Sequence, residues 1–163
     1  MKRISTASLV VSTLVAWLLL VSTGKKSAAL LPVVHAQDET SGCSLASLNG
    51  RYALSRQGTI VAQIPGFPAP PAPFGEVAIA TFDGAGAFSG RATVNIGGLV
   101  LNPVNFTATY TVNPDCTGTA TVNTGLGLTL HNAIVVIGGG KRFIGTETDP
   151  FEVVQTSGQR LGE

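Results

Sequence analysis

The 163-residue chain lacks the short motifs that mark the common catalytic folds. It has no G-x-S-x-G nucleophile elbow, no H-E-x-x-H zinc motif and no G-x-x-x-x-G-K-[ST] phosphate loop. Cysteine and histidine are limited to two residues each. Two cysteines with no histidine nearby make a poor metal site, so we expect neither a metal centre nor a cofactor.

Aromatic residues are also few, with ten in the whole chain. A membrane-spanning β-barrel turns apolar side chains to the lipid and carries aromatic belts at both interfaces. We therefore do not expect this chain to insert into a membrane as a barrel. Convincing helix signals are missing after residue 49, where glycine recurs at intervals close to the length of a strand. This spacing is typical of an all-β domain.

What the chain does have, at its start, is the pattern of a secretory signal peptide. Lys2 and Arg3 form a positive end, and residues 9–21 form an apolar stretch. The small-residue site at 34–36 predicts cleavage after Ala36. The predicted location is secreted or periplasmic.

Two alternatives to this cleavage stay open. The leader is long, so cleavage near residues 22–24 is possible, and residues 4–21 are just long enough to remain as a membrane anchor. No cysteine follows the apolar stretch closely, which argues against a lipid-anchored form. The predicted organisation is a leader at 1–36, an N-terminal arm at 37–49 and one domain at 50–163.

Removing the leader reverses the charge of the chain. The whole chain has a formal charge of +1, but residues 1–36 hold four of its ten basic residues and none of its nine acidic ones. The mature chain is therefore close to −3, which argues against nucleic acid and anionic membranes as partners. Its 127 residues are enough for one domain with a sizeable core.

Both cysteines, Cys43 and Cys116, lie in the predicted exported part. An oxidising compartment and an even count predict one disulfide between them. Cys116 lies in the turn "NPDCTG", where the proline favours turn initiation. We expect Asp115 to cap this turn rather than to act as a catalytic carboxylate.

Eight runs of strand-like residues follow the arm. They cover residues 50–60, 74–84, 86–96, 104–113, 118–124, 128–138, 141–149 and 151–161. Short connections, several of them rich in glycine, predict antiparallel neighbours. An eight-stranded meander has two exposed edges unless it closes. The sequence therefore predicts an all-β, up-and-down antiparallel barrel of eight strands, with a β-sandwich as the alternative.

The alternation is clearest at 105–112. Phe106 and Tyr110 lie on an apolar face, while Thr107, Thr109 and Thr111 lie on the opposite face. This pattern suits a strand with its threonine face in water. It does not say by itself which face of every strand is inside, because a register slip of one residue inverts the assignment.

One segment between the first two strands cannot be a central strand. "PGFPAPPAPF" has five prolines in ten residues, and we expect a stiff loop at 65–73. It is either a lid over a barrel mouth, with Phe67 or Phe74 contacting a ligand, or a rigid loop packed on the barrel end.

Candidate site residues are the polar and aromatic side chains that would face the interior. If Leu130, Ile134 and Val136 are inward, Asn132 joins them and His131 points out, and the reverse register exchanges the two. If Phe143 is inward, Glu147 is inward too, and burial would raise the pKa of its carboxyl. Possible charge or hydrogen-bond partners for it are Arg51, Tyr52, Arg56, Glu76 and Arg91. An ion pair that ties strand ends together is the alternative role for this carboxylate.

The candidates group into three kinds of site. The catalytic candidates are Glu147, Tyr52 and His131. The candidates for contact with a ligand are Tyr52, Phe106, Tyr110, Asn132, Phe143 and Glu147. The disulfide is Cys43 with Cys116, and no metal site is predicted.

Three stretches carry a resemblance to a known group. "GEVAIATFDGAGAFSG", "YTVNPDCTGTATV" and "VVQTSGQR" resemble small exported bacterial proteins similar to the allene oxide cyclase and dirigent type of calycin-like barrel. The resemblance covers about residues 50–161 and rests mostly on turn glycines. It implies an eight-stranded barrel that acts as a cyclase, a guide for coupling or a binder of apolar molecules, often as a trimer. No catalytic residue of the plant enzymes matches a position here.

Three functions follow as hypotheses. The first is a protein that binds a small apolar molecule in the barrel. The second is a cyclase or isomerase that holds a flexible substrate in a reactive shape, so that Glu147→Gln or Tyr52→Phe would abolish turnover. The third is a structural or surface interaction protein whose barrel is fully packed.

Overall fold

The computed structural model describes residues 42–162 of the chain. The predicted leader at 1–36 and the first part of the arm lie outside the described residues. The described part forms one closed barrel with a short N-terminal 3₁₀ helix, η1 (Leu45–Ser47).

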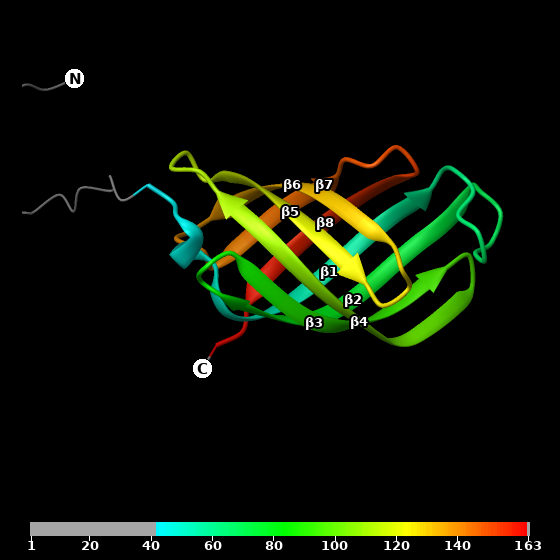
Figure 1. The fold of residues 1–163 in the computed structure, drawn as a ribbon, viewed down its shortest axis with the longest axis horizontal. Helices are drawn as coiled ribbons and strands as arrows, with labels where there is room; N and C mark the ends of the chain where they lie inside the picture. The colour runs from blue at the N-terminus through cyan, green and yellow to red at the C-terminus, as the bar shows by residue number, and fades with distance from the viewer. Residues whose placement is uncertain (1–41, 163) are drawn as a thin grey trace, which may run out of the picture. The chain divides into compact units, whose positions relative to one another are not determined.

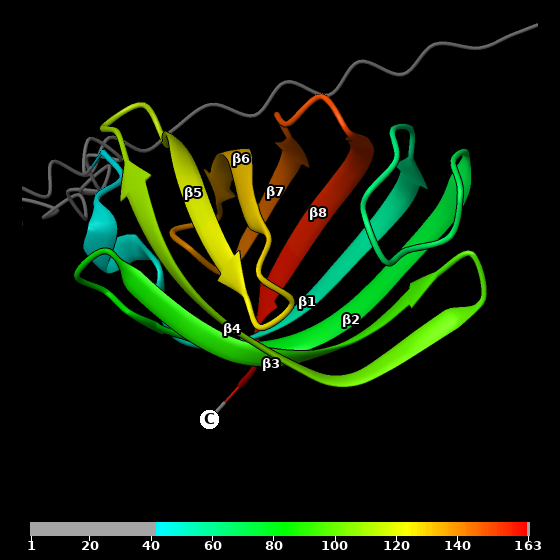
Figure 2. The same cartoon turned by 45° about the vertical axis from the view of Figure 1, so that its right-hand side comes forward.

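Eight antiparallel strands close into the barrel in chain order, as Figures 1 and 2 show. They are β1 (Asn49–Ile60), β2 (Ala72–Asp83), β3 (Ala87–Ile96), β4 (Leu99–Val112), β5 (Thr117–Thr124), β6 (Thr129–Ile137), β7 (Arg142–Glu147) and β8 (Glu152–Arg160). Pairing of β1 with β8, from Tyr52 opposite Arg160 to Ile60 opposite Glu152, removes the two open edges. The predicted up-and-down barrel is confirmed, and the alternative β-sandwich is wrong.

Alternation of side chains sets the inside and the outside of each strand. On β4, Phe106 and Tyr110 are buried while Thr107 and Thr109 are exposed. On β6, Asn132 is buried between apolar neighbours of the same parity. The period of two along each strand therefore fills the interior with apolar side chains and leaves a threonine-rich outer surface.

The predicted strand boundaries agree with the structure within two residues, except at the start of β4. That strand begins at Leu99 rather than 104, because Ile96 pairs with Leu99 directly across the turn. The ladder is irregular between Ala92 and Val94, where the partner strand contributes one extra residue. A bulge of this kind lets Pro103, which has no N–H to donate, sit within the strand.

One end of the barrel is closed by aromatic rings. The rings of Phe82 and Phe88 stack with centroids 4.3 Å apart, and Tyr52 meets Phe82 edge-on at 4.9 Å. Leu48, which is fully buried, follows η1 at this end, and the hydroxyl of Tyr110 donates to the carbonyls of Leu45 and Leu48 at 2.9 Å each. The aromatic rings and the N-terminal segment together seal this end against water.

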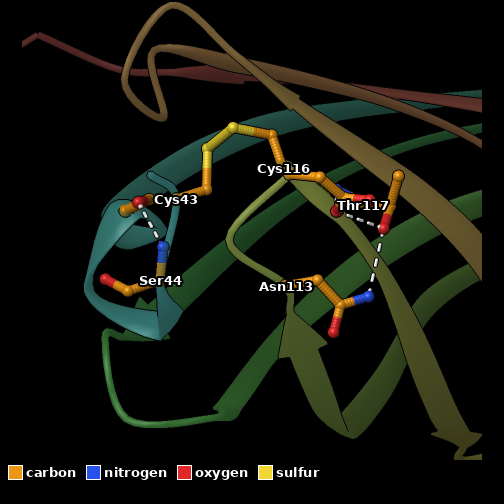
Figure 3. The surroundings of a disulfide bond; sticks show 7 residues. Cys43, Ser44, Asn113, Cys116 and Thr117 are labelled. Atoms are coloured by element: carbon orange, nitrogen blue, oxygen red, sulfur yellow. Dashed lines mark hydrogen bonds between the residues drawn. A yellow bond between two sulfur atoms is a disulfide. The ribbon is translucent and has the colours of Figure 1, made fainter. Parts of the chain in front are cut away.

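The predicted disulfide ties the N-terminal segment to this closed end (Figure 3). Cys43 and Cys116 are bonded with their Cα atoms 4.8 Å apart, and the backbone N–H of Cys43 donates to the carbonyl of Pro114. Asp115 Oδ1 accepts hydrogen bonds from the backbone and side chain of Thr117, at 3.0 and 2.6 Å. Asp115 therefore caps the turn, as the sequence predicts.

The opposite end carries the proline-rich loop. The loop runs through residues 61–71 and ends earlier than predicted, because Ala72 and Pro73 already pair with Ile60 and Thr59. Ile64, which belongs to this loop, is buried. Among residues 42–162, no cluster of paired aromatic rings like that of the closed end lies at this end.

Candidate functional site

A cavity of about 90 Å³ lies inside the barrel on the side of the proline-rich loop. Most of its wall is apolar, and the apolar lining residues include Leu54, Ile60, Ile64, Phe74, Phe88, Val104, Phe106, Leu128, Leu130, Ile134, Phe143 and Phe151. The loops 61–71, 125–128 and 148–151 contribute Ile64, Leu126 and Phe151. Loop residues therefore cover the cavity at the end of the barrel, and side chains from the strands form the rest of its wall.

Among residues 42–162, Arg56 carries the only positive charge in the wall of this cavity. Its Nη1 donates to Glu76 Oε2 at 3.0 Å, and its Nη2 donates to Glu147 Oε2 and Glu152 Oε1 at 2.9 Å each. The guanidinium also lies over the ring of Phe74, 5.2 Å from the centroid. We call Arg56, Glu76, Glu147 and Glu152 the ion cluster.

Strand register explains how these four residues meet. Arg56 on β1 lies directly opposite Glu76 on β2. Glu147 is the last residue of β7 and Glu152 the first residue of β8, so both point inward on either side of one turn. Because β8 pairs with β1, the two glutamates reach the arginine from the opposite side to Glu76.

The ion cluster is buried almost completely. The side-chain exposures are 10% for Arg56 and Glu76, 3% for Glu152 and 0% for Glu147. One guanidinium faces three carboxyl groups, and a buried carboxylate without a full counter-charge is costly. The expected response is that one carboxyl keeps its proton.

Glu147 is that carboxyl. Burial raises its pKa from an ordinary 4.5 to about 8, and hydrogen bonding to Glu152 and the negative charge of Glu152 add to the rise against the opposing effect of Arg56. Burial raises the pKa of Glu76 as well, although the charge of Arg56 opposes the rise. Near neutral pH the cluster therefore holds a proton on Glu147.

Two buried atoms of the ion cluster have no hydrogen-bond partner within residues 42–162: Arg56 Nε and Glu147 Oε1. A buried polar atom without a partner costs free energy, and such atoms are rare in folded proteins. A protonated Glu147 can donate a hydrogen bond to a neighbouring carboxylate. This bond would give Glu147 Oε1, one of the two atoms, a partner. Arg56 Nε keeps no such explanation.

Asn132 supplies the remaining polar group of interest in the cavity wall. The residue is 6% exposed, and its Oδ1 accepts from Thr156 Oγ1 at 3.3 Å. Its amide nitrogen donates no hydrogen bond to the part of the chain that the structure describes. The polar part of the cavity wall is therefore formed by Asn132, two threonines and the ion-cluster residues Arg56, Glu76 and Glu152, and the rest is apolar.

The structure separates the predicted ligand-contact residues into two groups. Phe106, Asn132 and Phe143 line the cavity, and Glu147 lies just behind its wall in the ion cluster. Tyr52 and Tyr110 also face the interior, but they belong to the closed end and do not line the cavity. Whether any of these residues binds a ligand stays a prediction.

His131 lies on the outer surface, away from the cavity. Its side chain is 53% exposed, and Nδ1 is 3.0 Å from Asp149 Oδ1, while its backbone N–H donates to Asp149 Oδ2 at 2.7 Å. Burial would raise the pKa of Asp149, but the hydrogen bonds from His131 outweigh this and lower it. The register in which Asn132 is inside is therefore the correct one.

Among the predicted partners of Glu147, Arg56 forms an ion pair with it. Glu76 forms an ion pair with the same arginine. Arg51 and Arg91 point outward. Glu152 was missed by the sequence reasoning. Glu152 lies an even number of residues before the buried Val154 and Gly158 on β8. This alternation in the sequence could have placed its side chain inside the barrel.

No group of histidine, cysteine, aspartate and glutamate side chains within residues 42–162 is arranged to hold a metal ion. Over the same range, no helix has the length and apolar character needed to cross a membrane. No protein-family model matches this chain, and comparison with curated proteins and with solved structures found no similar protein.

Proposed function

We propose that this protein binds one small, mainly apolar molecule inside its barrel. The observation that carries the proposal is the cavity of about 90 Å³, whose wall is apolar except for one polar side. Binding sites for small molecules typically combine an apolar wall with a few convergent polar groups. A barrel packed for structure alone would fill this space with side chains.

The proposed entrance is the end covered by the loops. The opposite end is blocked by the aromatic rings and the bonded N-terminal segment, whereas Ile64 and Phe151 come from loops at the cavity end. Movement of the loop 61–71 would open the shortest route for a ligand. The predicted role of this segment as a lid therefore stays part of the proposal.

The size of the cavity limits the ligand. An apolar cavity of roughly 150 Å³ takes a benzene molecule, and pockets for drug-sized ligands are about 300 Å³ or larger. A cavity of about 90 Å³ suits a short alkyl chain or the end of a longer one. We expect the ligand to occupy this space through a narrow apolar part.

The proposal is tested by titration with 1-pentanol, whose narrow alkyl chain suits the cavity, followed by NMR of the methyl groups. We expect saturable shifts at Leu54, Ile134 and Leu130, which line the cavity, with a stoichiometry near one. Absence of saturable shifts would contradict the proposal.

A matched pair of variants locates the site. Ala120 lines the cavity, and Ala120→Leu adds three carbon atoms to it, so binding should weaken at least tenfold. Ala53→Leu adds the same atoms on the exposed face of β1 and should leave binding unchanged. Equal affinities for the two variants would place the probe elsewhere.

A second candidate function is proton transfer to or from a bound molecule, as in an isomerase or cyclase. It is supported by the pairing of Glu152, which lines the cavity, with Glu147, whose carboxyl holds a proton near neutral pH. Such a pair can act as general base and general acid. The barrel would contribute by holding the substrate in a reactive conformation.

This second candidate is tested with a small ketone such as cyclopentanone in D₂O. Removal of an α-proton by the base, followed by return of a deuteron to the same carbon, replaces hydrogen by deuterium without other change. We expect exchange above the background rate that falls in both Glu152→Gln and Glu147→Gln. Exchange at the background rate, or exchange unaffected by both changes, would contradict this function.

The relationship to allene oxide cyclase and dirigent proteins stays a proposal. It is supported by the number and antiparallel order of the strands and by the turn motifs. The trimer that this relationship implies is likewise a prediction, and native mass spectrometry of the purified protein would test it.

Export is also proposed rather than established. It is supported by the signal-peptide pattern and by the disulfide between Cys43 and Cys116, because disulfides persist in oxidising compartments. Mass spectrometry of the secreted protein should give Gln37 as its first residue. A full-length mass would instead support a retained anchor.

A further inference from the structure

We propose that the polar end of the ligand is a protonated amine that binds against the carboxylates of Glu76 and Glu152. This inference rests on the proposed function, because it assigns the chemical class of a ligand in the same cavity. Its basis is the mismatch between one guanidinium and the carboxyl groups that surround it.

The first step of the argument is charge. With a proton on Glu147, the positive charge of Arg56 faces the two carboxylates of Glu76 and Glu152. The excess negative charge lies in a nearly water-free interior, where an uncompensated charge is unfavourable. One monovalent cation in the cavity would bring the buried charge to zero.

The second step is the supply of hydrogen-bond acceptors. Arg56 uses Oε2 of Glu76 and Oε1 of Glu152. The other oxygen of Glu76 accepts no hydrogen bond from the described residues, and neither it nor the other oxygen of Glu152 is among the fully buried atoms that lack a partner. Glu152 can also accept the proton of Glu147, but each carboxylate oxygen has two lone pairs, so a further donor can still be accepted. Both side chains line the cavity, so these two oxygens are available to a donor placed there.

The third step is Asn132, an independent polar group in the same wall. It is more than nine-tenths buried, and its Nδ2 donates no hydrogen bond within residues 42–162. The hydroxyl of Thr156 can donate or accept, so the amide can turn over and keep that bond while its oxygen faces the cavity. An ammonium group has three N–H donors, and the cavity wall then offers three acceptors.

The same arrangement disfavours an acidic ligand. A carboxylate in the cavity would meet the free oxygens of Glu76 and Glu152. Both terminal nitrogens of Arg56 are already bonded, and its Nε is buried beneath the surface of the wall. Fatty acids and other small carboxylates should therefore bind much more weakly than amines of the same length.

The test compares pentylamine, 1-pentanol and pentanoate, which share a five-carbon chain and differ only in the polar end. Affinities are measured by calorimetry or NMR at pH 7 and constant ionic strength. We expect pentylamine to bind most tightly and at least tenfold more tightly than pentanoate. This comparison uses the unaltered protein and does not depend on any variant.

Variants locate the effect. Glu152→Gln and Glu76→Gln should each reduce the preference for the amine over the alcohol at least fivefold. Asp115→Asn removes one negative charge from an exposed turn at the opposite end and should leave the preference unchanged. An equal effect of all three changes would mean that overall charge, rather than this cavity, attracts the amine.

The outcomes separate this inference from the proposed function. If 1-pentanol saturates the cavity but pentylamine binds no better than pentanoate, the assignment of an amine is wrong and the cavity remains a binding site. If no probe of any kind saturates, the proposed function itself is wrong.

Discussion

Glu147 and Glu152 contact the same atom, Nη2 of Arg56, each at 2.9 Å. The two carboxyl groups therefore converge on one nitrogen from opposite sides of the turn between β7 and β8. Two carboxylates held so closely in a buried site cannot both ionise without a large cost. The consequence is a proton on Glu147, whose loss should be visible in the stability of the whole domain.

The first prediction concerns pH. Burial and the neighbouring Glu152 raise the pKa of Glu147 to about 8 in the folded protein, while the unfolded chain has an ordinary carboxyl near 4.5. The folded state therefore binds more protons than the unfolded state between these values, and the free energy of unfolding falls as pH rises from about 5 to about 8. Each pH unit of that window is worth up to about 1.4 kcal/mol.

Urea denaturation at pH 5, 6, 7 and 8 measures this slope. Glu147→Gln keeps the shape of a neutral carboxyl and should make the slope shallower, leaving the smaller contribution of Glu76, whose pKa is also raised. Asp83→Asn is a useful comparison, because that carboxylate lies at an exposed turn, backbone hydrogen bonds lower its pKa, and its loss should not flatten the slope in this window. An unchanged slope in Glu147→Gln would place the retained proton elsewhere.

The second prediction concerns Arg56. Replacing it with methionine leaves Glu76, Glu147 and Glu152 without a counter-charge in the interior, and removal of one partner of a buried pair typically costs about 3–5 kcal/mol. Arg91→Met, at an exposed position on β3, should change stability by less than about 0.5 kcal/mol. Chemical denaturation of both variants at pH 7 makes the comparison.

A combined variant shows whether the cost comes from charge. Adding Glu147→Gln and Glu152→Gln to Arg56→Met leaves Glu76 as the one ionisable carboxyl group of the cluster and should recover part of the lost stability. If the triple variant is no more stable than Arg56→Met alone, the arginine contributes mainly through packing against Phe74.

The sequence is sufficient to predict the barrel because each strand carries its own two-residue period. The threonines of β4 and β5 identify the outer surface, and short glycine turns leave only antiparallel pairing between neighbours. The start of β4 was not predictable, because Pro103 argues against a strand unless the bulge beside Ala92 is known.

The candidate site is predicted less completely. The inward position of Glu147 and Asn132 can be predicted from the alternation of buried apolar neighbours along their strands. Alternation alone does not give the height of a side chain, meaning its position along the barrel axis. That height depends on the stagger between strands, which places Glu152 opposite Ile60 and Thr156 opposite Arg56, so the long arginine side chain reaches along the barrel to bond Glu152. For the same reason Tyr52 faces inward yet lies at the closed end, four residues before Arg56 on β1.

The third prediction concerns the disulfide. Cys43 and Cys116 close a loop with a sequence separation of 73 residues, and the chain-entropy model gives about 4 kcal/mol of stabilisation for a loop of this length. The double change Cys43→Ser with Cys116→Ser should lower the free energy of unfolding by several kcal/mol. The unaltered protein in excess dithiothreitol should show the same loss in guanidinium denaturation, whereas the double variant should not respond to the reductant. Equal stability with and without the bridge would contradict this role.

The last prediction separates Tyr52 from the cavity. Its hydroxyl donates to the buried carbonyl of Gly140 and accepts from Arg160 Nε at 3.1 Å. Tyr52→Phe leaves both groups without this partner and should cost about 1–3 kcal/mol of stability. Because Tyr52 does not line the cavity, the affinity for 1-pentanol should stay within twofold of the unaltered protein. Loss of binding or of ketone exchange in a folded Tyr52→Phe variant would instead support the catalytic role that the sequence predicts and would move the functional centre toward the closed end.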